Sequence, residues 1–321
     1  MKRRAFLLAA SALAAPLTVR AQAGPPRVGV IYYGETYEPI VEGLRAGLKE
    51  LGVVEGRHVR LDIRNGRGDA RTIEEAARAF EREKAAMIYC VPTTVTRIVQ
   101  RVTTMIPVVF CVGTDPIASG FVASYANPGG RFTGVHYLNT DLTAKRLELL
   151  KDLLPKARRV VTIYLQTNPT ATASVGQARE GAKKLGLQLI ERPVRSEAEL
   201  RDVLAALKPG EADAFLYVAD AFVQGRSQLV TERAKALRLP TMTYSLTVVE
   251  RGALVSYGVD TREVGRQSAR YVQRVLGGAR PSDLPVENMT RLDFVLNRRT
   301  AKEIGVKVPP AMIVRFDRVI E

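Results

Sequence analysis

The stretch from Pro107 to Tyr137, PVVFCVGTDPIASGFVASYANPGGRFTGVHY, decides the fold. Its apolar run Pro107–Val112 is long enough for one buried strand and stops at the turn residues Gly113-Thr114-Asp115-Pro116. A short helix over Ile117–Tyr125, an Asn-Pro-Gly-Gly turn and a second strand over Phe132–Tyr137 are predicted next. Polar groups at the mouth of a buried strand predict the rim of a binding cleft. The periodic segment that follows predicts a crossing into a second lobe.

Short apolar strands alternate with amphipathic helices on both sides of this stretch. Before it, strands are predicted over Arg27–Tyr33, Val59–Ile63 and Ala86–Val91, and helices over Tyr37–Leu51, Thr72–Lys84 and Thr94–Thr103. After it, helices are predicted over Leu142–Leu154, Thr172–Leu185, Glu197–Leu207 and Phe222–Leu237, and strands over Val160–Leu165, Leu187–Val194, Ala214–Val218, Thr241–Tyr244 and Ala253–Tyr257. Such alternation indicates βαβ units and parallel sheets covered on both faces. The predicted fold class is α/β, with two Rossmann-like lobes.

The C-terminal part predicts an amphipathic helix over Arg262–Leu276 and an extended segment over Leu292–Leu296. If the helix returns to the first lobe and the strand to the second, the chain crosses between lobes three times and forms a three-strand hinge. A helix and strand that only complete the second lobe are the alternative that periodicity leaves open. The predicted division gives residues 24–138 and 259–286 to the first lobe, and residues 139–258 and 287–321 to the second.

The N-terminal residues 1–23 have the three parts of an export signal: basic residues, an apolar run and an Ala-Gln-Ala cleavage site. Cleavage near Ala23 predicts an exported protein of the periplasm. Arg3-Arg4 leaves twin-arginine export open beside ordinary secretion. A retained N-terminal anchor is a further alternative, although the apolar run is short for a membrane span.

Charge and composition exclude several classes of function. The formal net charge is +15, and loss of the signal removes four basic and no acidic residues, which leaves about +11. The basic residues are dispersed among glutamates without aromatic stacking partners, so no nucleic acid is expected as a partner. His58 and His136 are the only histidines, and neither has metal-ligand spacing, so no metal or other cofactor is expected.

The two cysteines, Cys90 and Cys111, fall at the ends of apolar runs assigned to neighbouring strands. Buried free thiols are the favoured interpretation, because cysteine packs as a small hydrophobic residue. A disulfide is the alternative that an oxidising compartment would permit.

Enzyme motifs are absent from the sequence: there is no phosphate-binding loop, no G-x-S-x-G elbow, no H-E-x-x-H, and no G-x-G-x-x-G between a strand and a helix. A non-enzymatic protein is therefore expected. Two carboxylates across the cleft, Asp115 and Asp220, leave a hydrolase open as a less favoured alternative.

Candidate ligand contacts follow the predicted strands, because ligands of open parallel sheets bind at the carboxyl ends of the strands. Hydroxyl groups, carboxamides and helix N-termini suit a carboxylate, a carboxylate side chain suits an ammonium group, and tyrosine faces form an apolar wall. The candidates from the first lobe are Tyr33, Tyr37, Thr93, Thr94, Thr114 and Asp115, and those from the second are Asn168, Thr170, Asp220, Tyr244 and Ser245.

Each candidate also has a structural interpretation. Asp115, which precedes a proline, has the pattern of a helix N-cap. Thr93, Thr94 and Asp220 could likewise cap the helices that follow them, although Asp220 is the favoured residue for a ligand ammonium. The tyrosines could be ordinary interface residues.

Several segments resemble a known family. GLRAGLKELGVVEGRHVRLDIR, KRLELLKDLLP, GALVSYGVD, LPVENMTRLDFVLNRRTAKEIGVKVPP and above all the block containing GTDP and NPGG are similar to ABC-transporter substrate-binding proteins of the tryptophan/tyrosine-uptake type, a branch of the type I periplasmic binding proteins. The resemblance covers nearly all of the chain after the signal. It implies two Rossmann-like lobes with three crossovers, a small ligand enclosed by hinge closure, and ABC permease and ATPase subunits as partners of a monomer.

The resemblance places the candidate residues named above around the ligand, but the chain departs from the family at two points. Many relatives have Asp-Pro where this chain has Asp220-Ala221, and the tyrosine-rich loop over residues 32–37 is not a fixed feature of the family. The expected function is delivery of an amino acid or aromatic carboxylate to an ABC importer. A ligand-presenting subunit of a membrane sensor is the alternative.

Overall fold

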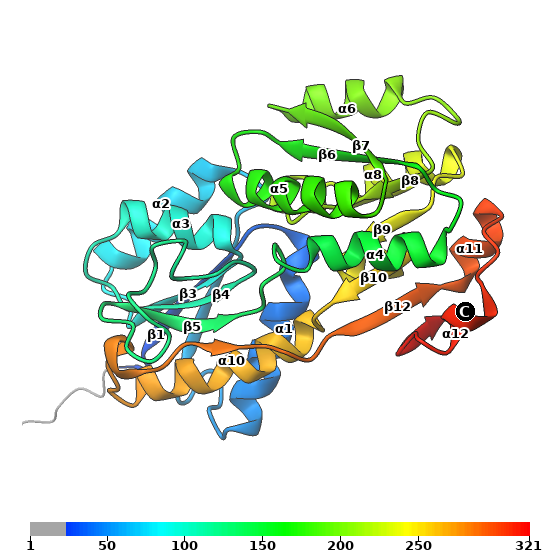
Figure 1. Ribbon diagram of the computed structural model, residues 1–321. Helices are drawn as coiled ribbons and strands as arrows, with labels where there is room; N and C mark the ends of the chain where they lie inside the picture. The colour runs from blue at the N-terminus through cyan, green and yellow to red at the C-terminus, as the bar shows by residue number, and fades with distance from the viewer. Residues whose placement is uncertain (1–23) are drawn as a thin grey trace, which may run out of the picture.

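The computed structural model describes residues 24–321, so the predicted signal segment, residues 1–23, lies outside the described residues. The described chain forms two α/β lobes side by side (Figure 1). The first lobe contains a six-stranded sheet of order β11-β5-β4-β3-β1-β2, and the second a seven-stranded sheet of order β13-β12-β10-β9-β8-β6-β7. The predicted α/β class with two lobes is confirmed.

The first lobe has parallel pairing throughout its sheet. Its strands are β1 (Arg27–Tyr32), β2 (Arg60–Asn65), β3 (Met87–Val91), β4 (Val108–Val112), β5 (Phe132–His136) and β11 (Glu287–Asn288). Its helices are α1 (Glu38–Glu50), α2 (Ala70–Arg82), α3 (Thr93–Val102) and α10 (Thr261–Leu276), with single 3-10 turns at Glu35–Tyr37 and Pro281–Asp283. Every residue of β3 and β4 is buried, as expected for central strands covered by helices on both faces.

The second lobe has one antiparallel pair, β10 with β12, in an otherwise parallel sheet. Its strands are β6 (Arg159–Leu165), β7 (Gln188–Val194), β8 (Ala214–Leu216), β9 (Thr241–Thr243), β10 (Val255–Gly258), β12 (Asp293–Asn297) and β13 (Arg318–Ile320). Its helices are α4 (Thr143–Leu153), α5 (Pro169–Lys184), α6 (Glu197–Ala206), α7 (Ala221–Gln224), α8 (Ser227–Ala236), α9 (Leu246–Glu250), α11 (Arg298–Ile304) and α12 (Pro310–Ile313).

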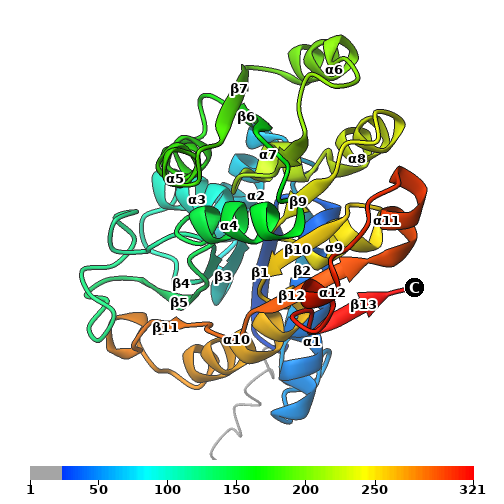
Figure 2. The same ribbon diagram turned by 45° about the vertical axis from the view of Figure 1, so that its right-hand side comes forward.

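The chain passes between the two sheets three times. The passages run from β5 to α4, from β10 to α10 and from β11 to β12. Helix α10 therefore returns to the first lobe, and β12 returns to the second (Figure 2). Strand β11 pairs with β5. The third passage therefore begins after Asn288, a little later than the predicted boundary at residue 286.

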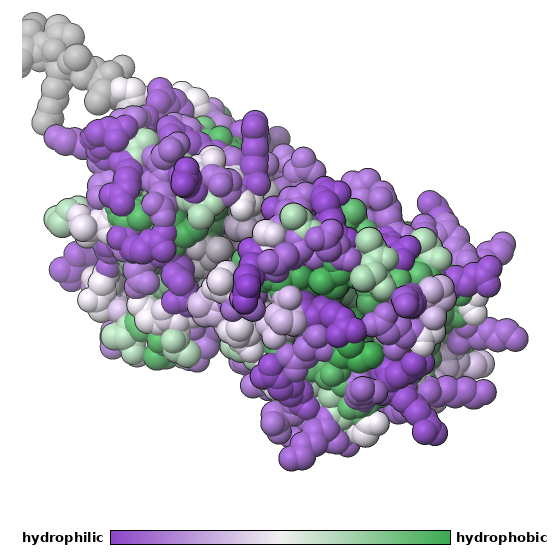
Figure 3. Space-filling view, turned by 90° about the horizontal axis from the view of Figure 1, so that it is seen from above, coloured by the Kyte–Doolittle hydropathy of each residue, from purple (hydrophilic) through white to green (hydrophobic). Residues whose placement is uncertain are grey.

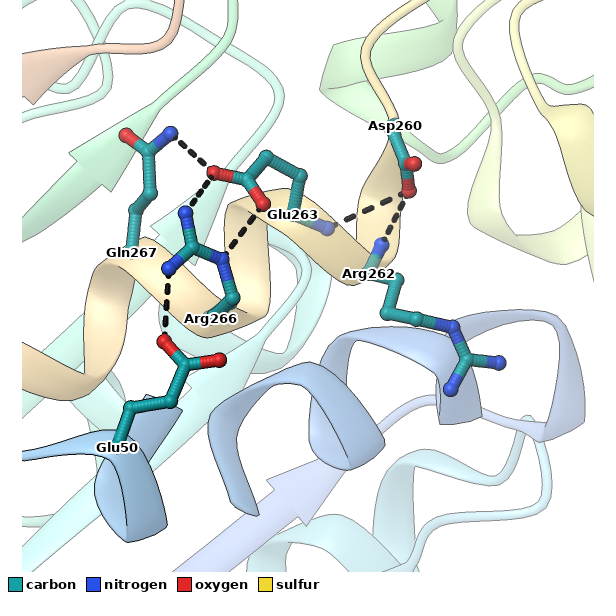
Figure 4. A network of polar contacts seen from close by, with 6 residues as sticks. All are labelled: Glu50, Asp260, Arg262, Glu263, Arg266 and Gln267. Atoms are coloured by element: carbon teal, nitrogen blue, oxygen red, sulfur yellow. Dashed lines mark hydrogen bonds and ion pairs between the residues drawn. The ribbon is translucent and has the colours of Figure 1, made fainter. Parts of the chain in front are cut away.

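Helix α10 packs directly on α1, and glycines allow this close approach. A Cβ atom at Gly265 would stand 1.9 Å from the Ile40 carbonyl oxygen, and one at Gly43 would stand 1.9 Å from the Arg262 carbonyl oxygen. On the outer side of the contact, Arg266 binds Glu263 on its own helix and Glu50 on α1 (Figure 4). Helix α10 is thus a fixed part of the first lobe.

Two predicted helices differ in the structure. Residues 117–125 form one turn, which ends at Gly120, and then an irregular segment instead of a helix, because Gly120 takes a φ of +71° and ends the helical hydrogen bonding. The predicted helix Phe222–Leu237 is divided into α7 and α8 at Gly225 and Arg226, where the Arg226 side chain turns back to bind the Phe222 carbonyl oxygen.

Cys90 and Cys111 are buried free thiols on the neighbouring strands β3 and β4, which confirms the favoured interpretation. Within residues 24–321, no helix is long and apolar enough to cross a membrane, and no cluster of three or more ligating side chains suits a metal. Hydrophilic side chains predominate over the face of both lobes seen in Figure 3, which agrees with dispersed charge.

Candidate ligand-binding site

A narrow cavity lies where the carboxyl ends of the strands from the two lobes face each other. The first lobe and the first passage contribute Tyr37, Pro92, Thr93, Thr94, Gly113, Tyr137 and Asn139, and the second lobe contributes Thr170, Ala219, Ala221 and Tyr244. The cavity has a volume of about 30 Å³, room for on the order of two water molecules. This is the position that the strand order of two open parallel sheets favours.

The first-lobe wall is held by a chain of hydroxyl groups. Thr93, the first residue of α3, accepts a hydrogen bond from the Gly113 backbone N–H at 3.2 Å and pairs with the Thr114 hydroxyl at 3.2 Å. Thr114 in turn pairs with Ser119 at 2.9 Å. These bonds join the ends of β3 and β4 and fix the hydroxyl groups beside the cavity.

The second-lobe wall is built around the carboxylate of Asp220. It accepts hydrogen bonds from the Leu165 backbone N–H at 2.6 Å, from Asn168 Nδ2 at 2.9 Å and from the Phe222 backbone N–H at 2.9 Å. Burial raises the pKa of this carboxyl group, although the three donors oppose the shift. Asn168 also caps α5 by accepting from the Thr170 backbone N–H at 3.1 Å. Asp220 and Asn168 therefore shape the wall from behind.

Three tyrosines, Tyr37, Tyr137 and Tyr244, form the aromatic part of the lining, and each is less than one-tenth exposed. Burial is the main cause that raises the pKa of all three phenols, so their hydroxyl groups are neutral at physiological pH. The Tyr244 hydroxyl donates to the Asp220 carbonyl oxygen at 3.4 Å. The cavity thus combines aromatic faces with neutral hydroxyl donors.

A second, larger cavity of about 420 Å³ lies at the edge of the contact between lobes. It is lined by Tyr33, Gly34, Glu35, Asn65, Arg67 and Gly68 from the first lobe and by Glu197, Gly225 and Arg226 from the second. Burial raises the pKa of Tyr33 to about 12, although the positive charge of Arg226 opposes this shift.

The structure brings five of the predicted contacts together in the narrow cavity: Tyr37, Thr93, Thr94, Thr170 and Tyr244. Thr114, Asn168 and Asp220 lie behind its walls, and Tyr33 lines the larger cavity instead. Asp115 accepts from the backbone N–H groups of Ile117 and Ala118 and caps a turn. Ser245 is 1% exposed, and within the described residues its hydroxyl has no hydrogen-bond partner.

Sequence reasoning missed Tyr137 and Asn139, which also line the cavity. Tyr137 ends the predicted strand Phe132–Tyr137 and Asn139 follows it, at the predicted crossing between lobes, and the contacts predicted from strand ends do not include this crossing. Arg146 was missed as well: it is fully buried on α4 and lies below the Tyr244 ring, 5.5 Å from its centroid. The leucine periodicity of α4 gave no signal for a buried arginine.

Two α/β lobes with three connecting passages and a cavity between them define a ligand-binding protein of the periplasmic-binding-protein class. The family model for ABC transporter substrate binding proteins matches residues 27–320, so the chain belongs to this family of non-enzymatic binding proteins. A tyrosine-binding protein of Clostridioides difficile is 26% identical over 276 residues, which cover 86% of this chain and 79% of that protein.

Solved structures share the whole fold. A conserved domain protein from Vibrio cholerae has a TM-score of 0.85 and 26% identity, covering 92% of this chain and 99% of that one. The domain from Streptococcus pneumoniae in complex with L-Trp has a TM-score of 0.84 and 23% identity, covering 92% and 100%. A ligand-free, open substrate-binding protein from Clostridium difficile has a TM-score of 0.64 at 24% identity, covering 92% and 99%.

Proposed function

We propose that this protein captures an amino acid with an aromatic side chain outside the cytoplasm and presents it to the permease and ATPase subunits of an ABC importer. The observation that carries the proposal is the narrow cavity, in which three tyrosines and three threonines meet between two lobes. The names of two relatives support the ligand class, because one is a tyrosine-binding protein and the other was crystallised with L-Trp. The signal-like residues 1–23 support the exported location.

The lining suits such a ligand chemically. Tyr37, Tyr137 and Tyr244 offer faces and edges against which an aromatic ring packs favourably. The hydroxyl groups of Thr93, Thr94 and Thr170 are donors for a carboxylate. The Asp220 carboxylate, one residue from two lining alanines, is the group of the second lobe that would attract an ammonium.

The size of the cavity indicates how the ligand enters. Its volume of about 30 Å³ is far below the roughly 300–1,000 Å³ of ligand sites in proteins. An amino acid therefore requires the lobes to separate at the three passages and then to close around it. Closure of this kind gives the transporter a ligand-bound shape to recognise.

The composition of the chain makes the test direct. The sequence has no tryptophan, so all indole fluorescence in the sample comes from the added L-tryptophan, and a change in its emission reports binding. The experiment is titration of refolded, ligand-stripped protein with L-tryptophan, and thermal-shift assays with L-tyrosine, L-phenylalanine, L-alanine and L-glutamate. We expect a blue-shifted indole emission and a higher Tm with the aromatic amino acids only, because ligands that bind the native state stabilise it. Stabilisation by a non-aromatic compound alone would contradict the proposed ligand class.

A further inference from the structure

Arg146 is a buried cation without a carboxylate partner. It is 0% exposed in the first turn of α4, and no carboxylate oxygen of residues 24–321 lies within ion-pair distance of it. Burial lowers the pKa of its guanidinium group to about 9. Leaving a charge in the interior without a counter-ion is costly, so this position calls for a compensating group.

The guanidinium group binds the two passages that join the lobes. Its Nη1 donates to the Asn139 carbonyl oxygen at 2.7 Å, and its Nη2 donates to Asn139 Oδ1 at 2.9 Å. Its Nε donates to the Tyr257 carbonyl oxygen at 2.7 Å. Asn139 lies on the first passage, and Tyr257 is the next-to-last residue of β10, just before the second. All three acceptors are neutral, so they satisfy the donors without balancing the charge.

These bonds also fix the orientation of the Asn139 amide. A guanidinium group has donors only, so the Asn139 atom that faces Arg146 must be the amide oxygen, and the Nδ2 group must point the other way. Asn139 lines the narrow cavity, and its Nδ2 lies beside Gly113, another lining residue: a Cβ at Gly113 would stand 3.5 Å from it. No acceptor among the described residues takes an N–H of this amide. A donor and a buried positive charge behind it thus converge on the cavity.

We propose that Asn139 donates its amide N–H to the carboxylate of the bound amino acid, and that Arg146 is the positioning residue that orients this amide and whose charge the carboxylate balances. This inference rests on the proposed function, because it takes the ligand to be an amino acid. It assigns the carboxylate end to the first passage, opposite the hydroxyl groups of Thr93 and Thr94. The ligand then contacts the hinge itself through a residue that Arg146 ties to the second passage.

The decisive variant is Asn139→Asp, tested with L-tryptophan and L-tryptophanamide. The variant keeps an oxygen for Arg146 and turns the contact into an ion pair, so it should fold. It removes the N–H donor and cancels the buried charge. We expect the affinity for L-tryptophan to fall by about ten- to a hundredfold, the effect of one charge-assisted hydrogen bond, and the affinity for L-tryptophanamide to change by less than about threefold. Asn297→Asp, a buried asparagine of the second lobe that caps α11, is the matched control and should leave both affinities within about twofold.

A second variant separates positioning from folding. Arg146→Lys keeps a positive charge but loses the fork that binds both oxygens of Asn139, so the preference for L-tryptophan over L-tryptophanamide should decrease. A purely structural role for Arg146 would lower both affinities by the same factor. The inference is overturned if Asn139→Asp binds L-tryptophan as tightly as the natural protein, or if both variants leave the preference unchanged. Failure of the natural protein to bind any aromatic amino acid would instead overturn the proposed function, and the inference with it.

Discussion

Asp220 lies beside the cavity with its carboxylate already engaged by three donors of its own lobe. Asp220→Ala would leave the Leu165 and Phe222 backbone N–H groups and the Asn168 amide unpaired in the interior. We expect a loss of at least about 2 kcal/mol in the free energy of unfolding, measured by urea denaturation. Asp220→Asn keeps one acceptor oxygen but places an amide NH₂ group against the Leu165 N–H. Its loss in the free energy of unfolding should therefore be smaller.

Asp220→Asn also tests whether Asp220 attracts the ligand ammonium. The useful comparison is between L-tryptophan and indole-3-propionate, which lacks the amino group. If Asp220 attracts the ammonium, Asp220→Asn lowers the affinity for L-tryptophan by about tenfold and leaves indole-3-propionate nearly unchanged. Equal effects on the two compounds would make Asp220 a structural residue only.

Cys90 and Cys111 provide a chemical probe of the first-lobe core. Burial raises the pKa of the Cys90 thiol to about 12 and that of Cys111 further, so neither forms a thiolate in the folded protein near neutral pH. We expect no reaction with a thiol reagent at pH 8 in the native state and two reactive thiols after unfolding. Because the folded pKa is raised, the unfolded state alone loses these protons above pH 9, and stability should fall as the pH rises from 9 towards 12. Rapid labelling of the native protein would contradict this burial.

Individual site residues were predictable from the sequence where a simple rule applies. Tyr37, Thr93, Thr94, Thr170 and Tyr244 follow strands of the two sheets, and the carboxyl ends of such strands meet at the cleft. Asn139 follows a strand too and falls at the predicted crossing between lobes, but the rule names strand ends and gives no sign that the crossing itself lines the cavity. Arg146 is predicted to be exposed by every hydropathy rule, and its burial depends on acceptors 7 and 111 residues away in the sequence.

The contact between α1 and α10 shows how one element from the end of the chain completes the first lobe. Gly265→Ala would place a methyl group 1.9 Å from the Ile40 carbonyl oxygen, so the two helices must move apart. We expect a destabilisation of about 1–3 kcal/mol, the usual effect of overpacking, measured by chemical denaturation. Gly176→Ala in α5 is the control: its Cβ would meet nothing within 4 Å, and it should stabilise by up to about 1 kcal/mol. Equal effects of the two substitutions would mean that helix propensity, and not close approach, determines both.

Element identity was predictable wherever hydrophobic periodicity was regular, which includes every strand of both sheets except the short edge strands β11 and β13. Periodicity failed at residues 117–125 and within Phe222–Leu237, where Gly120 and Arg226 set the local backbone. It also carries no information on strand direction. The antiparallel pairing of β12 with β10 follows from the third passage, which brings the chain back to the second lobe from the opposite side.

At the scale of the whole molecule, the two lobes also touch at Arg226, which lies away from the three passages of the hinge. Arg226 Nε donates to the Glu197 carboxylate at 2.9 Å, and the guanidinium group stacks on Phe222, 3.9 Å from the ring centroid. Contacts within the second lobe therefore fix the position of the guanidinium group. It then reaches the first lobe, where Gly68 leaves space: a Cβ there would stand 3.4 Å from Arg226 Nη1. Ala221 of the second lobe joins the first-lobe hydrophobic core beside this contact. A preformed contact of this kind favours the closed arrangement.

Arg226→Met should therefore shift the balance of the lobes towards the open arrangement. Removal of the polar contact that Arg226 makes with Tyr33 and Gly68 of the first lobe, worth about 1 kcal/mol, should speed ligand dissociation by about fivefold, because the closed state alone contains this contact. Stopped-flow release of L-tryptophan measures this rate, and small-angle scattering measures the expected increase in radius of gyration.

Arg201→Met is the matched control, because Arg201 binds the same Glu197 carboxylate but lies on α6 within the second lobe. Hydrogen bonds from both guanidinium groups, Arg201 first, lower the pKa of Glu197, so an effect that came only from the charge of Glu197 would appear in Arg201→Met as well. A faster release in Arg226→Met alone is expected if the contact across the lobes stabilises closure, and equal rates in the two variants would show that it does not.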